Sequence, residues 1–263
     1  MANGITILGT GGDSFIVGRQ TRASGGIILT TDQNQLHIDP GPGTLQQLKQ
    51  HELHPRETTT ILLSHQHVNH AGDAAALISA MTHNGMDKRG ILISNTLDNC
   101  YVPGYQQSLT EKSIAIQPDS KVGINDIEIR AIQAKHYDSN AFSYLIQTPT
   151  YRLGYTGDTA YTEEWAKKFI GCNILLVNTK YPVAVNEGDH LNVDDAIKLV
   201  NHVKPQLAVI THFGAKMLDA DPLAQARYIQ RETKVQVVAA KDGLHIAPAH
   251  YDAQQKQKIL GNF

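Results

Sequence analysis

The chain has 263 residues, 41% of them hydrophobic and 18% charged, and its 23 basic and 25 acidic side chains give a formal net charge of -2. This apolar content excludes a disordered chain, and the length fits one compact domain over residues 1–263. The near-neutral charge excludes a chain-wide attraction for a polyanion. Because no run of five basic residues occurs either, a long nucleic acid is disfavoured as a partner and a small-molecule substrate is favoured.

The cysteines and the N-terminus point to a cytoplasmic protein. Met1 to Gly4 lack the basic start and long apolar region of a signal peptide, and no apolar stretch reaches the roughly 18 residues of a membrane span. Cys100 and Cys172 lie far apart without a Cys-x-x-Cys spacing, which favours free thiols in a reducing compartment. We therefore expect a cytoplasmic location and no membrane partner, and we leave a homo-oligomer open.

The first half of the chain predicts short strands with helices between them. Apolar runs rich in β-branched residues are separated by Gly, Pro and Asp. These runs predict strands over Ile5 to Leu8, Ile27 to Thr30, Leu36 to Ile38 and Ile61 to Leu63. Helical spacing and good helix formers predict helices over Thr44 to His51 and Ala71 to Met81.

The rest of the chain continues with strands and then alternates strands with helices. Further strands are predicted over Ile91 to Ser94, Ser113 to Ile116, Ile127 to Ile132, Phe142 to Gln147, Tyr151 to Tyr155, Ile174 to Val177, Leu207 to Ile210 and Val235 to Ala239. Helices are predicted over Val193 to Val203, with Asn192 as N-cap, and over Pro222 to Glu232. We expect an α/β fold in which two packed sheets carry helices on their outer faces, a four-layer αββα sandwich.

Three histidines follow the apolar run at residues 61–63. His65 and His67 are one residue apart, so both side chains can point to the same side of an extended segment, and His70 returns from the start of the next helix. Neutral imidazole is the commonest zinc ligand. The alternative is a surface loop that contains three histidines by chance.

The remaining candidate ligands strengthen the metal interpretation. His136, Asp158 and His212 each stand just past the C-terminal end of a predicted strand. Residues gathered along one edge of packed sheets can converge on a single cleft, which histidines scattered through a core would not do. We therefore expect one or two divalent metal ions, with zinc first and manganese or iron as alternatives.

The His65-x-His67-x-Asn69-His70 run, with His136, Asp158 and His212, resembles the metallo-β-lactamase superfamily. The resemblance extends over nearly the whole chain, because residues 8–12 and 37–41 are similar to the superfamily's opening strands. The closest likeness is to hydrolases related to tRNase Z and to small phosphodiesterases, and it includes residues 81–83, 88–90, 211–214 and 216–217.

The resemblance implies a ligand set. His65, His67 and His136 would bind the first metal, His70 and His212 the second, and Asp158 both. Asn69 departs from the pattern, since the superfamily usually has aspartate there. An amide oxygen is a poorer ligand than a carboxylate, so the second site should be weaker. This leaves a working enzyme with altered metal occupancy or a degraded site.

Four further residues have two interpretations each. Asp39 resembles an aspartate that orients metal-bound histidines, or it is a turn residue before Pro40. His37 is expected to be a strand residue and not a ligand. His190 resembles a histidine that protonates the leaving group or holds the phosphate, or it packs at the start of the next helix. Lys216 could contact an anionic substrate, or it is a solvated lysine.

The predicted chemistry is hydrolysis by attack of a metal-bound hydroxide, with Asp158 and His190 as catalytic residues. The ligand set alone fits phosphodiesters, thioesters, lactones or β-lactams. His190 favours a small phosphodiester. A lactone or other ester hydrolase is the second hypothesis, and a non-catalytic metal-binding protein with a second site weakened by Asn69 is the third.

Overall fold

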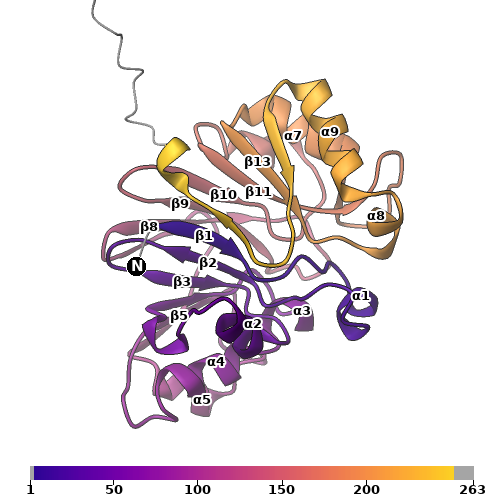
Figure 1. Ribbon diagram of the computed structural model, residues 1–263. Coiled ribbons are helices and arrows are strands. Elements are labelled where there is room, and N and C mark those ends of the chain that lie inside the picture. The colour runs from indigo at the N-terminus through magenta and orange to yellow at the C-terminus, as the bar shows by residue number, and fades with distance from the viewer. Residues whose placement is uncertain (1–2, 252–263) are drawn as a thin grey trace, which may run out of the picture.

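The computed structural model describes residues 3–251. Its strands form two sheets packed face to face, and helices cover the outer face of each sheet (Figure 1). This arrangement is the predicted αββα sandwich. The prediction of one domain over residues 1–263 includes residues 1–2 and 252–263, which lie outside the described part of the chain.

The first sheet has the strand order β15-β1-β2-β3-β4-β5-β6. Its strands are β1 (Gly4–Ile7), β2 (Ile27–Thr30), β3 (Gln35–Ile38), β4 (Thr60–Leu62), β5 (Ile91–Ser94), β6 (Lys112–Ala115) and β15 (Leu244–Ile246). β15, β1, β2 and β3 pair antiparallel, whereas β3, β4, β5 and β6 run parallel. The helices between the parallel strands are the crossovers that such pairing requires.

The second sheet has the order β14-β13-β11-β10-β9-β8-β7, and β12 pairs with β11. Its strands are β7 (Lys121–Ile124), β8 (Ile127–Gln133), β9 (Phe142–Gln147), β10 (Arg152–Tyr155), β11 (Ile174–Tyr181), β12 (Leu191–Asn192), β13 (Leu207–Thr211) and β14 (Gln236–Ala239). β10, β11, β13 and β14 run parallel, so their C-terminal ends meet at one edge of the sheet.

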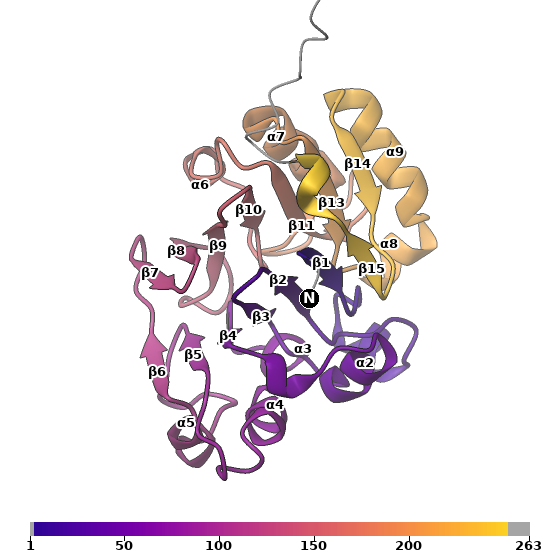
Figure 2. The same cartoon turned by 60° about the vertical axis from the view of Figure 1, so that its left-hand side comes forward.

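Helices lie on the two outer faces, as Figure 2 also shows. The α-helices are α1 (Ser14–Gly18), α2 (Thr44–Gln50), α3 (Val68–Ala71), α4 (Ala74–Met81), α5 (Gly104–Leu109), α6 (Glu163–Lys167), α7 (Val193–Val203), α8 (Ala215–Asp219) and α9 (Pro222–Thr233), and the 3-10 helices are η1 (Pro55–Glu57) and η2 (Pro248–Tyr251). In the described part of the chain, no helix has both the length and the apolar character needed to cross a membrane.

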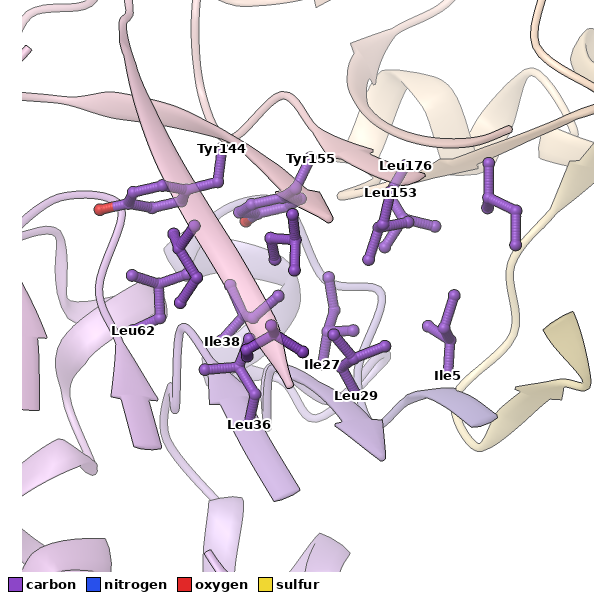
Figure 3. Packing of buried hydrophobic residues seen from close by; sticks show 14 of the residues in the cluster. Ile5, Ile27, Leu29, Leu36, Ile38, Leu62, Tyr144, Leu153, Tyr155 and Leu176 are labelled. Atoms are coloured by element: carbon purple, nitrogen blue, oxygen red, sulfur yellow. The ribbon is translucent and has the colours of Figure 1, made fainter. Parts of the chain in front are cut away.

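Apolar side chains from the facing strands form the core between the sheets. Figure 3 shows Ile5, Ile38 and Leu62 of the first sheet opposite Tyr155 and Leu176 of the second. All five are almost fully buried. Burial of such side chains stabilises a fold by about 1.5–3 kcal/mol each, so this core holds the two sheets together and fixes their ends relative to each other.

The structure confirms most of the predicted elements and corrects some bounds. The predicted helix over residues 71–81 is divided into α3 and α4, and β11 continues four residues beyond the predicted end at Val177. Helix α5 begins within residues 97–107, which the sequence predicts to be an irregular loop, so the end of that prediction is wrong. The strands β7 and β15 were not predicted; both are short, and β7 contains Gly123.

Candidate metal centre

The predicted metal ligands gather where the ends of the two sheets meet. His65 and His67 stand between β4 and α3, and His70 lies within α3. The other three follow strands of the second sheet, namely His136 after β8, Asp158 after β10 and His212 after β13. Residues separated by up to 147 positions therefore share one cleft.

One group of donor atoms comprises His65, His67, His136 and Asp158, whose ligand atoms all lie within 4.8 Å of one another. His65 Nε2 is 3.0 Å from His67 Nδ1, and His136 Nε2 is 3.3 Å from the same atom. His65 Nε2 is 3.8 Å from Asp158 Oδ2. These nitrogens face a common point.

A second group comprises His70, His212 and Asp158. Asp158 Oδ2 is 3.2 Å from His70 Nε2 and 3.1 Å from His212 Nε2. This oxygen also belongs to the first group, so one carboxylate oxygen lies between two sets of imidazoles. Asn178 fixes its position, because Nδ2 of Asn178 donates to Asp158 Oδ1 at 2.8 Å and leaves Oδ2 facing the histidines.

The glycine-rich segment before α1 holds His212 in place. Gly12 N donates to Phe213 O at 2.9 Å, and Phe213 N donates to Thr10 O at 2.7 Å. A Cβ on Gly12 would lie 2.1 Å from the His212 carbonyl oxygen, so glycine is required at this close approach. His212 itself has a positive φ of 64°, and the flanking bonds hold this uncommon backbone conformation.

Outer hydrogen bonds set the protonation of three imidazoles. His70 Nδ1 lies 2.9 Å from Asp39 Oδ2, and His136 Nδ1 lies 2.7 Å from Asp189 Oδ2. A carboxylate accepts, so each Nδ1 carries a hydrogen and each Nε2 faces the cleft. The Ser64 hydroxyl has the same effect on His65, because it donates to Asp39 and accepts from His65 Nδ1 at 2.9 Å. Burial opposes protonation of His70, but Asp158 and Asp39 outweigh it and raise the pKa of His70 to about 10, so its Nε2 also donates to Asp158 Oδ2 at 3.2 Å.

Asp39 is buried and joins the two sheets. It accepts from Ser64 N at 2.7 Å, from Ser64 Oγ at 2.6 Å and from the Tyr155 hydroxyl at 2.6 Å, in addition to His70. Its φ is 51°, so it also turns the chain before Pro40. Asp39 therefore forms the turn and holds His70, and its role toward a metal-bound histidine stays a prediction.

Charges in the centre shift the pKa values of its members. Burial opposes ionisation of Asp158, but His212, His70 and His190 outweigh it and hold the pKa of this carboxyl well below its usual range. Burial and then the charge of His70 lower the pKa of His65 well below 6.5. A permanent negative charge surrounded by imidazole nitrogens is an environment that suits a cation.

The donor set fits divalent metal ions. His212 Nε2 is buried and has no hydrogen-bond partner, although it lies 3.1 Å from Asp158 Oδ2. Two atoms this close that are not aligned for a hydrogen bond have the separation of two ligands on one ion, since donors about 2.0–2.1 Å from zinc lie about 3.3 Å apart. His37, by contrast, bonds Gly25 O through Nε2 at 2.8 Å and is a strand residue, as predicted.

His190 lies beside the centre with a lysine next to it. Its Nδ1 is 3.6 Å from Asp158 Oδ2, and its Nε2 is 3.1 Å from Lys180 Nζ. Burial lowers the pKa of His190 to about 4, with Asp158 opposing and Lys180 adding to the shift. Because an ammonium group only donates, His190 Nε2 accepts, and the hydrogen of the neutral ring is on Nδ1.

Asn69 lines the cleft with His67, Asp158, Lys180 and His190. Lys216 does not line this cleft, because its ammonium group pairs with Glu187 and its side chain is 56% exposed. The lysine that the structure brings to the centre is Lys180.

Sequence reasoning missed several residues that the structure places around the donors: Ser64, Tyr155, Asn178, Lys180 and Asp189. Lys180 had a usable signal. It follows the apolar run of residues 174–177, and polar residues after strand ends were the criterion that identified the ligands. The predicted strand stopped at Val177, so this rule was not applied to β11.

The comparisons agree with this geometry. Residues 34–213 match the family described as the β-lactamase superfamily domain. This chain belongs to that family. The β-lactamase superfamily chain is also 30% identical over 251 residues to the uncharacterized protein MJ1374 of Methanocaldococcus jannaschii, covering 92% of this chain and 94% of that protein.

Solved structures share the metallo-β-lactamase fold of this superfamily member. The fold protein YhfI from Bacillus subtilis has a TM-score of 0.77 at 17% identity, covering 92% of this chain and 98% of YhfI. A diphosphatase of the PhnP family has a TM-score of 0.69 at 15% identity, and the match covers 94% of this chain and 97% of the diphosphatase. The short form of human tRNase Z has a TM-score of 0.67 at 15% identity, and the match covers 92% of this chain and 98% of the tRNase. The predicted resemblance to metallo-β-lactamase-fold hydrolases, tRNase Z among them, is thereby confirmed.

Proposed function

We propose that the chain hydrolyses small phosphodiesters with one or two divalent metal ions, zinc first. The observation that carries the proposal is Asp158 Oδ2, which lies between two groups of imidazole nitrogens in a cleft that also holds a lysine. The first ion would be held by His65, His67, His136 and Asp158, and the second by His70, His212 and Asp158. When bound, such ions lower the pKa of water to about 7 from about 15.7 and act as Lewis acids.

The residues of the chain have separate tasks in this reaction. The oxygen of a water molecule forms a bond to phosphorus while the P–O bond to the leaving alcohol breaks, which gives a phosphomonoester and an alcohol. Asp158, held ionised by its surroundings, can orient that water by accepting a hydrogen bond from it, and the proton that the water loses passes to solvent. The leaving oxygen takes a proton in turn, and Lys180 and His190, which both line the cleft, carry N–H groups that can donate it.

Lys180 supports a phosphodiester over a neutral ester. It is the one Lys or Arg residue among the residues that line the cleft, beside the carboxylates of Asp13 and Asp158 that would face the metal or solvent, and a phosphodiester brings one negative charge to the ammonium group. The PhnP-family diphosphatase and tRNase Z, whose folds are similar, are also named for reactions at phosphate groups. A lactone would leave the ammonium group without a charge partner.

Metal analysis and a substrate panel test the proposal. We expect the purified protein to contain a divalent metal and, loaded with zinc, manganese or iron, to hydrolyse bis-p-nitrophenyl phosphate. Asp158→Ala should lower kcat/KM at least ~100-fold, since loss of even an outer partner of a metal ligand costs about 10–100-fold. Asp32→Ala, at an exposed turn, is the matched control.

Two outcomes would overturn the proposal. Opening of lactones without phosphodiester turnover would instead support an ester hydrolase. Metal binding without turnover of any substrate would support a non-catalytic metal-binding protein.

A further inference from the structure

The lining of the cleft beside the metal centre combines charged, imidazole and aromatic side chains. The volume of the cleft is about 350 Å³, at the lower end of the range of roughly 300–1,000 Å³ found for small-molecule sites. Its acidic and basic lining residues are Asp13, His67, Asp158, Lys180 and His190, and Tyr101 is the aromatic residue of the lining. Val68, 42% exposed, adds further apolar surface. A ligand that filled this cleft would therefore contact both charge and an aromatic ring.

Gln66 fixes the position of Tyr101 relative to the metal ligands. Gln66 stands between His65 and His67, and its Oε1 accepts from Tyr101 N at 3.0 Å. The Gln66 amide also donates to Asn95 Oδ1 at 2.7 Å, at the end of β5. The segment that carries Tyr101 is thus attached to the same short loop that carries two of the ligands.

The Tyr101 side chain is available to a ligand. It is 47% exposed, whereas Tyr144 and Tyr155 are buried and donate their hydroxyl hydrogens to Leu63 O and to Asp39. Among the described contacts, none pairs the Tyr101 ring with another aromatic or charged group. Exposed aromatic rings in such clefts are suited to stack with planar rings.

Lys180 is held by its backbone while its charge lacks a carboxylate partner. Gly214 N donates to Lys180 O at 3.1 Å, which fixes the end of β11. Its Nζ lies 3.1 Å from His190 Nε2, and within residues 3–251 no carboxylate forms an ion pair with it. Lys216, in contrast, is paired with Glu187. The ammonium group of Lys180 can therefore bind an anionic group at the metal centre.

We propose that the cleft recognises a phosphodiester that carries a planar ring, as a nucleotide ester does, with Lys180 contacting a phosphoryl oxygen and Tyr101 stacking with the ring. This inference rests on the proposed phosphodiester chemistry and specifies its substrate. It is directed to a small ligand, because the cleft lining contains a single lysine, whereas several cationic side chains are needed to follow a phosphate backbone.

Ligand binding to the zinc-loaded protein tests the two contacts separately. Adenosine 5′-monophosphate and ribose 5-phosphate share the phosphate and sugar but differ in the ring. With stacking worth about 1–3 kcal/mol per base, the Kd of the nucleotide, measured by calorimetry, should be roughly 5- to 150-fold lower than the Kd of ribose 5-phosphate. This factor is the affinity ratio of the two ligands. Tyr101→Ala should remove most of this ratio, and Tyr101→Phe should keep it.

Matched variants supply the controls. Tyr105→Ala changes an exposed tyrosine of the same region that does not line the cleft, and it should leave the ratio unchanged. Lys180→Met should weaken both ligands about tenfold and Lys180→Arg should restore them, while Lys216→Met should have no effect. Thermal unfolding of each variant reports whether it is folded.

The outcomes separate this inference from the proposed function. Equal affinity of the wild-type protein for the two ligands, no binding of either, or equal effects of Tyr101→Ala and Tyr105→Ala would overturn the recognition of a ring. If the predicted ratio appears but bis-p-nitrophenyl phosphate is not hydrolysed, the cleft recognises the ligand and the catalytic proposal fails. If bis-p-nitrophenyl phosphate is hydrolysed but the two ligands bind equally well, the catalytic proposal is supported and the recognition of a ring fails.

Discussion

Asn69 places a neutral amide in a cleft that is otherwise arranged for a cation. It stands one position before His70, and its carbonyl oxygen lies so near Gly41 that a Cβ there would be 2.2 Å away. The backbone is thus held tightly while the side chain reaches the cleft. The consequence of this residue is chemical, because an amide oxygen brings no negative charge to a metal.

Asn69→Asp should raise the affinity for the second metal ion. A carboxylate adds one negative charge at nearly constant shape, and we expect at least ~10-fold tighter binding, or about 1.4 kcal/mol. Zinc titration against a competing chelator measures this. Asn84→Asp adds the same charge at an exposed position after α4 and should change nothing. Unchanged stoichiometry and affinity in Asn69→Asp would contradict the prediction.

Single residues differ in how well a sequence reveals them. The histidine run and Asp158 were predictable, because few residue types bind metals and their spacing is local or follows strand ends. Asp189 was not, since its role depends on contact with His136, 53 positions away. Lys216 was preferred over Lys180 only because it follows His212 in sequence, whereas its ion pair with Glu187 is a tertiary contact.

At the scale of elements, helix α7 begins at the N-cap residue that the sequence predicts. Asn192 Oδ1 accepts from Asp195 N at 2.9 Å and Asn192 Nδ2 donates to Val185 O at 2.8 Å. The predicted N-cap is therefore confirmed, and it also ties the helix to the segment before His190. The apolar face of α7 packs on the second sheet through Val193, Leu199 and Val200.

Asn192→Ala should lower the free energy of unfolding by about 1–2 kcal/mol, near the upper end for a lost cap because two hydrogen bonds are removed. Urea unfolding followed by circular dichroism measures the change. Asn201→Ala, at an exposed position within the same helix, is the matched substitution and should change stability by less than about 0.5 kcal/mol. Equal effects of the two substitutions would contradict a capping role.

Elements were predicted well where hydrophobic runs were long and poorly where pairing decided the structure. β9, β11 and α9 have clear apolar patterns. β15 has three residues and exists because β1 supplies its antiparallel partner. α5 lies in a polar stretch whose Leu109 is buried against the α4 layer. Such elements follow from tertiary contacts, which a single sequence does not display.

On the scale of the whole molecule, each sheet has one face toward the shared core and one toward helices. His37 belongs to the face of the first sheet that is covered by helices. It stands between Leu36 and Ile38, whose side chains point into the core between the sheets, and it is fully buried. Burial lowers its pKa from 6.5 to about 4, with the hydrogen bond to Gly25 and the charge of Asp39 opposing the shift. The folded protein therefore keeps this imidazole neutral under conditions in which the unfolded chain protonates it.

His37 should make stability dependent on pH. Its contribution is fully present above pH 6.5 and is lost as pH falls toward 4, because only the unfolded state takes up the proton in that window. The free energy of unfolding should fall by roughly 3 kcal/mol over this window because of His37 alone. His37→Gln keeps a donor for Gly25 O and removes the titration. Urea unfolding from pH 7.5 to 4 should show a steeper decline for the wild-type protein than for this variant, and parallel curves would refute the assignment.

The bonds that converge on Asp39 limit how this molecule can admit a ligand. Ser64 belongs to the first half of the chain and Tyr155 to the second, and both hold the same carboxylate. A hinge that opened the sandwich would break these bonds and separate the imidazoles from Asp158. A ligand must therefore enter with the two halves closed, past the exposed side chains of Tyr101 and Val68.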